Sequence, residues 1–192
     1  NTVEGDYGFL LESVEGGENI ARYSFLGSQP AMVQTVRRNE VTTLHPDTGE
    51  TATRTVEDPF AELEAVMDGF RPVPVAGLPP FHGGAVGFLG YDMARNFEDI
   101  PDTTTDDAEI PDSVFMLTDT VLVFDRVLHK VKVVSNAHLA DGMDVDQAYD
   151  EAVAKVEATI DRLRRPLPGL GKSTGGVGER PDPRSNMPRE EF

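Results

Sequence analysis

A carboxylate and a hydroxyl stand next to each other at the end of a short apolar run near the start of the chain. Glu12 and Ser13 follow Phe9-Leu10-Leu11, and a second run begins at Arg22. A charge or a hydroxyl in a strand is costly to bury unless it has a partner. An amino acid ligand needs an acceptor for its ammonium, a donor for its carboxylate and an apolar slot, and these residues could supply all three.

A purely structural explanation of the same residues is also open. In that case Glu12 pairs with Arg22 across a hairpin, and Ser13 satisfies a backbone group. The residue types alone do not choose between a ligand site and a structural ion pair.

Two strands are needed to position these groups. The runs 9–14 and 22–26 are largely apolar and are separated by about seven residues, which is typical of a hairpin. Side chains alternate along a strand, so the first run presents two sets of residues on opposite faces. One set is Phe9, Leu11 and Ser13, and the other is Leu10, Glu12 and Val14.

The remaining pattern predicts an α+β fold, in which an antiparallel or mixed β-sheet carries two main packed helices. The acidic range 98–112 is predicted to be a surface loop, because it offers little to bury. Further β-like runs occupy 31–38, 41–44, 51–55, 114–117, 120–125 and 131–135.

Two helices are expected, over 59–68 and 144–165. Asp58 is the predicted N-cap of the first, Pro59 its first residue, and Gly69 its terminator. Apolar residues at helical spacing predict a core-facing stripe on each helix. The stripes are Phe60, Leu63, Val66, Met67 and Phe70 in the first helix, and Ala148, Ala152, Val156, Ile160 and Leu163 in the second.

Glycine recurs at every third position in Gly84, Gly87 and Gly90. A dinucleotide-binding loop requires a tight turn that opens a helix, and a P-loop requires a following Gly-Lys-Ser/Thr, whereas this segment continues as a strand. Glycines inside a strand indicate a bulge or a close approach of a neighbouring backbone.

The charge balance restricts the partners. The chain has 34 acidic and 17 basic residues and a net charge of −17, which argues against nucleic acid and anionic membranes. Strong acidity, with only four lysines, indicates a salt-adapted, halophilic cytoplasm; the alternative is a merely acidic mesophilic protein. The absence of cysteine, signal peptide and membrane span supports a cytoplasmic location. The four histidines show no metal-ligand or triad spacing, so no catalytic or metal-binding residue is predicted here.

Five stretches carry a resemblance to a known family. They are Leu10-Leu11-Glu12-Ser13, Arg22-Tyr23-Ser24-Phe25-Leu26-Gly27, Gly83 to Asp92, Asp119 to Asp125, and Arg184 to Phe192. In order and spacing they resemble the N-terminal region of anthranilate synthase component I. The related aminodeoxychorismate synthase of folate biosynthesis is an alternative, and a stand-alone, non-catalytic binding domain is a third.

The resemblance implies an enzyme that converts chorismate to anthranilate and pyruvate, the first step of tryptophan biosynthesis. It implies ammonia from a glutamine amidotransferase subunit and Mg²⁺ held in a C-terminal chorismate-binding domain. Residues 1–165 would be the regulatory domain, 166–183 a Pro/Gly-rich linker, and 184–192 the start of that truncated catalytic domain. L-Tryptophan would bind as feedback inhibitor, and the implied site residues are Leu11, Glu12, Ser13, Arg22, Tyr23 and Ser24.

Overall fold

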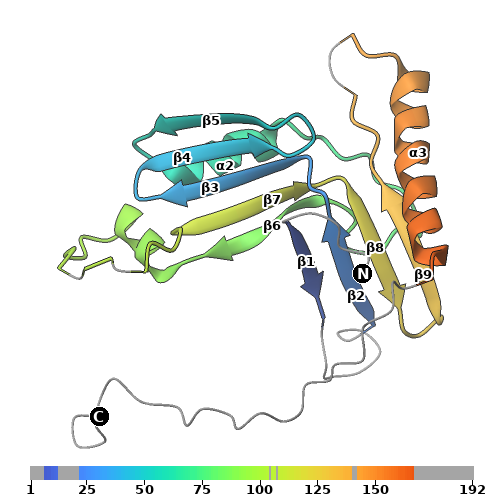
Figure 1. Cartoon of the computed structure of the whole chain (residues 1–192), viewed down its shortest axis with the longest axis horizontal. Helices are drawn as coiled ribbons and strands as arrows, with labels where there is room; N and C mark the ends of the chain where they lie inside the picture. The colour runs from blue at the N-terminus through green and yellow to red at the C-terminus, as the bar shows by residue number, and fades with distance from the viewer. Residues whose placement is uncertain (1–6, 13–21, 104, 107, 140–141, 167–192) are drawn as a thin grey trace, which may run out of the picture.

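The computed structural model, which describes residues 7–12, 22–103, 105–106, 108–139 and 142–166, confirms the α+β prediction. Its strands form two antiparallel sheets (Figure 1). The first sheet has the order β1-β2-β8-β9, with β1 Gly8–Leu11, β2 Tyr23–Ser28, β8 Thr120–Asp125 and β9 Lys130–Ser135. The second sheet has the order β5-β4-β3-β7-β6, with β5 Glu50–Thr55, β4 Glu40–His45, β3 Met32–Arg37, β7 Ser113–Thr118 and β6 Gly84–Leu89.

The predicted first hairpin is present. β1 pairs with β2, placing Leu10 opposite Leu26 and Leu11 opposite Phe25. β1 is the edge strand of the first sheet, so its apolar side chains are less buried than a central strand would make them: Leu10 is 57% and Leu11 43% exposed.

Two continuous segments of the chain pass from one sheet to the other: β2 of the first sheet is followed by β3 of the second, and β7 of the second is followed by β8 of the first. β2 pairs with β8 in the first sheet, and β3 pairs with β7 in the second. The crossing segments are 29–31 and Asp119, and the backbone N–H of Ala31 donates to Leu117 O of β7 at 2.9 Å. The sequence pattern did not reveal this division, because it depends on which distant strands pair.

Helix α2, Pro59–Asp68, begins as expected. The Asp58 carboxylate accepts from the N–H groups of Phe60 at 2.8 Å and Ala61 at 3.3 Å, and Pro59 is buried. Phe60 packs against a core of Val36, Val41 and Met93, the last of which lies in the 3₁₀ helix η1, Tyr91–Asn96. The expectation that the whole stripe is core is wrong at its far end: Met67 is 37% and Phe70 36% exposed, because burial is concentrated at the start of α2.

The glycine-rich segment is strand β6, and its predicted close approach is confirmed at Gly87. A Cβ atom at this position would lie 1.9 Å from the carbonyl oxygen of Val114 in β7. β7 therefore leaves no room for a side chain at Gly87.

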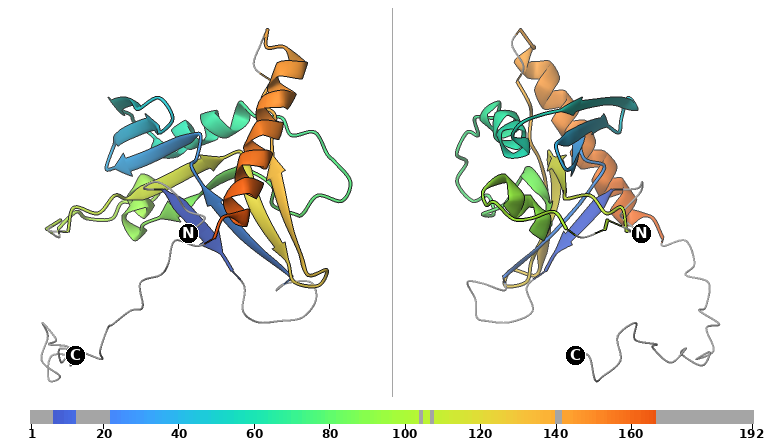
Figure 2. Two further views of the ribbon diagram at one scale, coloured as in Figure 1. Left: turned by 45° about the vertical axis from the view of Figure 1, so that its right-hand side comes forward. Right: turned by 90° about the vertical axis from the view of Figure 1, so that its left-hand side faces the viewer.

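Helix α3, Val145–Arg164, is capped by Asp144, whose carboxylate accepts from the N–H of Asp146 at 2.9 Å. It lies along the first sheet (Figure 2), with Ala148, Ala152 and Thr159 buried. Leu163, expected on this face, is 39% exposed, so the predicted stripe is not buried at the end of α3. Within the described ranges, no helix combines the length and apolarity needed to cross a membrane.

Candidate functional site

Arg22 is held by a buried aspartate of β8. Its Nε donates to Asp125 Oδ1 at 3.1 Å and its Nη2 to Oδ2 at 2.7 Å. The Asp125 side chain is fully buried and also accepts from the N–H groups of Val127 at 3.1 Å and Leu128 at 3.0 Å. The hydrogen bond from Arg22 lowers the pKa of Asp125 to about 2, against the opposing effect of burial. Through Asp125, Arg22 thus links the start of β2 to the turn after β8.

The structural pairing of Glu12 with Arg22 is therefore wrong. Glu12 instead forms an ion pair with Arg126, the first residue after β8. Nη2 of Arg126 also donates to Oγ of Ser24 at 3.0 Å, and the Arg126 N–H donates to Arg22 O at 2.9 Å. Two predicted site residues, Glu12 and Ser24, are brought together by a guanidinium that the sequence reading did not single out. Its place directly after the apolar run 120–125 was the available signal, but only the β2–β8 pairing brings it to the hairpin.

The remaining described site residues, Tyr23 and Leu11, lie on the opposite face of the sheet from Ser24. Tyr23 lies under Arg22, with the guanidinium carbon 4.9 Å from its ring centroid. Since side chains alternate, Tyr23 faces away from Ser24, and Leu11, which pairs with Phe25, shares the face of Tyr23. Ser13 lies outside the described residues.

Aromatic rings cover that second face. The ring centroids of Tyr23 and Phe25 are 5.9 Å apart, those of Phe25 and Phe81 are 5.5 Å apart, and those of Phe9 and Phe81 are 6.3 Å apart. These contacts fix the orientation of β1 and β2 from the side opposite Ser24.

An apolar row runs beside the polar cluster. Leu10 pairs with Leu26, and Leu26 pairs with Leu122, so the three leucines lie in one row across the sheet. They share the face of Ser24, two residues along β2 from it. Glu12, Arg126 and Ser24 therefore border an apolar surface, of which Leu10 is more than half exposed.

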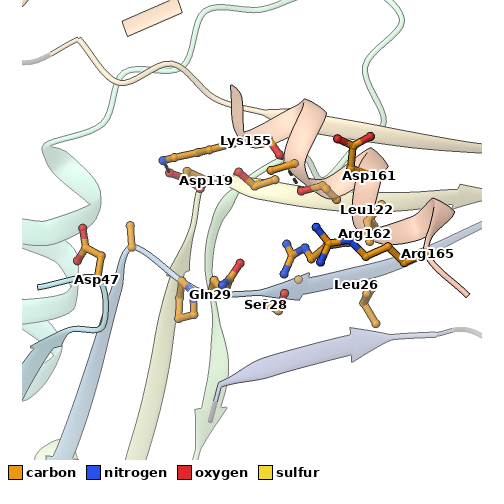
Figure 3. A pocket seen from close by; sticks show the side chains of 16 residues that line it. Leu26, Ser28, Gln29, Asp47, Asp119, Leu122, Lys155, Asp161, Arg162 and Arg165 are labelled. Carbon is orange, nitrogen blue, oxygen red and sulfur yellow. Dashed lines mark hydrogen bonds and ion pairs between the residues drawn. The ribbon is translucent and has the colours of Figure 1, made fainter. Parts of the chain in front are cut away.

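The same row leads to a cavity of about 660 Å³ between the first sheet and α3 (Figure 3). Leu26 and Leu122 form part of its floor, and Arg162 and Arg165 lie at one end. Lys155 of α3 closes another side through an ion pair of 2.5 Å with Asp119 at the crossing segment. The cavity is thus bounded by the bend that joins the two sheets and by the helix that covers it.

The part of the chain that the structure describes contains no group of three or more His, Asp or Glu side chains that could hold a metal ion. His82 Nδ1 lies 3.2 Å from Pro79 O, and the His138 ring stacks edge-on against Phe70 with centroids 5.1 Å apart. Both histidines thus have local structural contacts.

Comparison with known proteins gives consistent relatives. No protein-family model matches the chain. Anthranilate synthase component 1 of Acetivibrio thermocellus is 39% identical over 155 residues, which are 80% of this chain and 30% of that protein. The Pseudomonas putida protein of the same name is 34% identical over 188 residues, 96% of this chain and 37% of that protein. The crystal structure of anthranilate synthase component I from Streptococcus pneumoniae matches with a TM-score of 0.58 and 25% identity, over 86% of this chain and 34% of that one.

The α+β fold of the chain thus matches one part of a longer protein of known structure. Over most of its own length the chain is similar to anthranilate synthase component 1. It spans about a third of the length of the relatives it matches.

Proposed function

We propose that this chain is the regulatory part of an anthranilate synthase component I and binds L-tryptophan at the first hairpin. The full-length, cytoplasmic protein would convert chorismate to anthranilate and pyruvate. The similarity of 34–39% over most of the chain supports the reaction. The N-terminal position of the chain, the linker at 166–183 and a catalytic domain starting near 184 are parts of the same proposal.

The observation that carries the binding site is the convergence of Glu12, Ser24 and Arg126. Glu12 and Ser24 were predicted to belong to one site, and they share a contact to a single guanidinium although Arg126 is more than 100 residues away in sequence. A carboxylate, a hydroxyl and a guanidinium beside a row of leucines match the groups of an amino acid.

The proposal includes a glutamine amidotransferase subunit that delivers ammonia, and Mg²⁺ at the catalytic centre. Mg²⁺ requires several oxygen ligands in octahedral geometry. The described residues do not offer such a set, so the ion is assigned to the proposed catalytic domain and no step of this chain passes through it.

The test is the tryptophan inhibition of anthranilate formation by the full-length protein, followed by the fluorescence of the product. Replacing Ser13 with phenylalanine should weaken inhibition about two- to tenfold through loss of one hydrogen bond, and further through steric exclusion. The rate at saturating chorismate should be unchanged, because the substrate binds in another domain.

Thr51→Phe is a matched control, because Thr51 is exposed on β5, the outer strand of the second sheet. It should leave the inhibition curve unchanged. An active Ser13→Phe enzyme with wild-type tryptophan sensitivity would contradict the proposed site. A full-length protein that forms aminodeoxychorismate instead of anthranilate would contradict the proposed reaction.

A further inference from the structure

We propose that the cavity between the first sheet and α3 is a separate ligand site, which binds a small aromatic carboxylate through Arg162 and Arg165. Its volume of about 660 Å³ lies within the range of small-molecule sites. The described hairpin residues Glu12, Ser24 and Arg126 do not line this cavity. The inference therefore stands apart from the proposed tryptophan site and does not depend on the proposed function.

The face of α3 that lies against the first sheet changes in character along the helix. In the first half of α3 this face carries Ala148 and Ala152, which are buried. In the second half the same face carries Lys155, Thr159 and Arg162, at the spacing of three and four residues that keeps side chains on one side of a helix. These residues stand where a helix packed only against a core would carry large apolar side chains.

The electrostatics of a helix end explain only part of this arrangement. Cations in the last turn complement the dipole of a helix on whichever face they lie. Arg164 does so from the solvent side, with a side chain that is 77% exposed. Arg162 and Arg165 instead line the cavity, and both side chains extend into it (Figure 3). Two guanidiniums that face one cavity favour the binding of an anion there.

A carboxylate is the anion that suits these two side chains. A guanidinium carries five N–H donors in a planar fork, so it can keep a partner within the protein and bind a ligand carboxylate as well. Such bonds are charge-assisted and can be bidentate. Nη1 of Arg162 is buried, so a bond formed at this end of the cavity is partly shielded from water and correspondingly stronger.

The acidic side chains of the lining do not oppose an anion at this end. Asp119 pairs with Lys155 at 2.5 Å, and Asp161 lies 3.8 Å from Arg164. Asp47 lies on the far side of the cavity from the two arginines (Figure 3). The end formed by the two arginines is therefore the positive end of the cavity.

The sides of the cavity between sheet and helix are apolar and favour a flat ring. Leu26 and Leu122 are paired neighbours on β2 and β8, so their side chains lie next to each other on the sheet. Ala158 lines the helix side and is too small to fill the space. A planar ring can lie between the leucines and Ala158 with its carboxylate at the arginines. An inorganic anion has no group to place there. The proposed product, anthranilate, belongs to this chemical class.

Gln29 gives the cavity a backbone feature that is also typical of ligand sites. It lies in the crossing segment with a φ of 56°, in the left-handed region that glutamine rarely adopts. Backbone strain of this kind persists only where the surrounding structure enforces it, and it clusters at ligand sites. The segment thereby presents Gln29 at the edge of the cavity (Figure 3), where its amide can bond to a substituent of the ring.

The test is calorimetric titration of the full-length protein with three probes: benzoate, benzyl alcohol, which has the ring without the charge, and inorganic phosphate, which has the charge without the ring. Benzoate should bind more tightly than either of the others. Arg165→Gln should weaken benzoate binding about tenfold or more through loss of a charge-assisted hydrogen bond, and should leave benzyl alcohol binding unchanged. Arg165 is exposed, so the substitution should not affect folding.

A second variant tests the cavity itself. Ala158→Leu should abolish the binding of both benzoate and benzyl alcohol, because the larger side chain occupies the space of the ring. It should not lower the Tm, because Ala158 is exposed and leucine is a good helix former.

Two controls separate this site from other effects. Arg54→Gln removes an exposed guanidinium that pairs with Glu62 and lies on β5 of the second sheet. It should leave benzoate binding unchanged. Ser13→Phe, which tests the proposed tryptophan site, should also leave benzoate binding unchanged, so a failure of the one proposal is distinguishable from a failure of the other.

Four results would overturn the inference. They are a wild-type protein that does not bind benzoate, tighter binding of phosphate than of benzoate, wild-type benzoate affinity in either Arg165→Gln or Ala158→Leu, and equal losses of benzoate and benzyl alcohol in Arg165→Gln. The last result would show that Arg165 only shapes the cavity.

Discussion

At the scale of single residues, Asp125 and Arg126 are neighbours with different tasks. Asp125 is buried and joins Arg22 to the turn after β8, whereas Arg126 is exposed and joins β8 to Glu12. Sequence reading found Glu12, Ser24 and Arg22 through their local run. The structural alternative, in which Glu12 pairs with Arg22, chose the wrong arginine, because the pairing depends on a strand about 100 residues further along the chain.

Asp125 gives a prediction about pH. Its folded-state pKa is about 2, below the ordinary value of 3.8, so its contribution to stability is fully present above about pH 4 and is lost as the pH falls through 2. Asp125→Asn should lower the Tm near neutral pH, and the gap to the wild type should close on acidification. Thermal melts of both proteins between pH 6 and pH 2 measure this.

Asp106→Asn is the matched control. Asp106 also pairs with an arginine, Arg37, at 2.8 Å, but both side chains are at least 40% exposed. Exposed pairs contribute little, so this variant should lower the Tm much less. An equal effect of the two substitutions would show that the burial of Asp125 is unimportant.

At the scale of elements, most strands and both helices could be predicted from periodicity, caps and turns. Asp58 caps the first helix as predicted, and Asp144, predicted as the first residue of the second helix, is its N-cap. The division into two sheets could not be predicted, because it depends on long-range pairing at the crossing segments. The cavity under α3 was missed for the same reason, since its walls come from distant parts of the chain.

Gly87 gives a prediction for the β6–β7 pair. An alanine Cβ would lie 1.9 Å from Val114 O and 2.8 Å from Phe115 Cα, both backbone atoms that cannot rotate away. Gly87→Ala should therefore lower the free energy of unfolding by about 1–3 kcal/mol or more, as overpacking does. Urea denaturation at a fixed salt concentration provides the measurement.

Gly69→Ala is the control for this substitution. Gly69 has helical φ of −66° at the end of α2, and an added Cβ would meet only Val66 O at 3.2 Å. Alanine also reduces the conformational entropy of the unfolded chain, which offsets that tight contact. We therefore expect the free energy of unfolding to change by no more than about 1 kcal/mol. A Gly87→Ala protein as stable as Gly69→Ala would contradict the close approach of β6 and β7.

At the scale of the whole molecule, the net charge of −17 is the dominant electrostatic feature. Repulsion between acidic groups acts over about 10 Å at 0.1 M salt and about 3 Å at 1 M salt. Salt also weakens exposed ion pairs such as Arg38–Asp102, at 3.5 Å, but each such pair contributes about 1 kcal/mol or less. The relief of repulsion should exceed this loss.

The Tm should accordingly rise between dilute buffer and molar KCl. A parallel series in a non-ionic osmolyte separates the screening of charge repulsion from the exclusion of a solute from the protein surface, which also raises the Tm. A Tm that stays flat or falls with KCl would remove the salt-adapted interpretation of the composition.

The strand pair that runs through both sheets has a consequence for how the chain folds. β2 and β3 are contiguous with each other, as are β7 and β8, and their pairings join residues about 80 to 100 positions apart. Because each of these two segments supplies a central strand to both sheets, we expect the β2–β8 and β3–β7 pairings to form together. The loop that must close before these two pairings form contains β4, β5, α2, β6 and η1, so we expect both pairings to form slowly in a single kinetic phase.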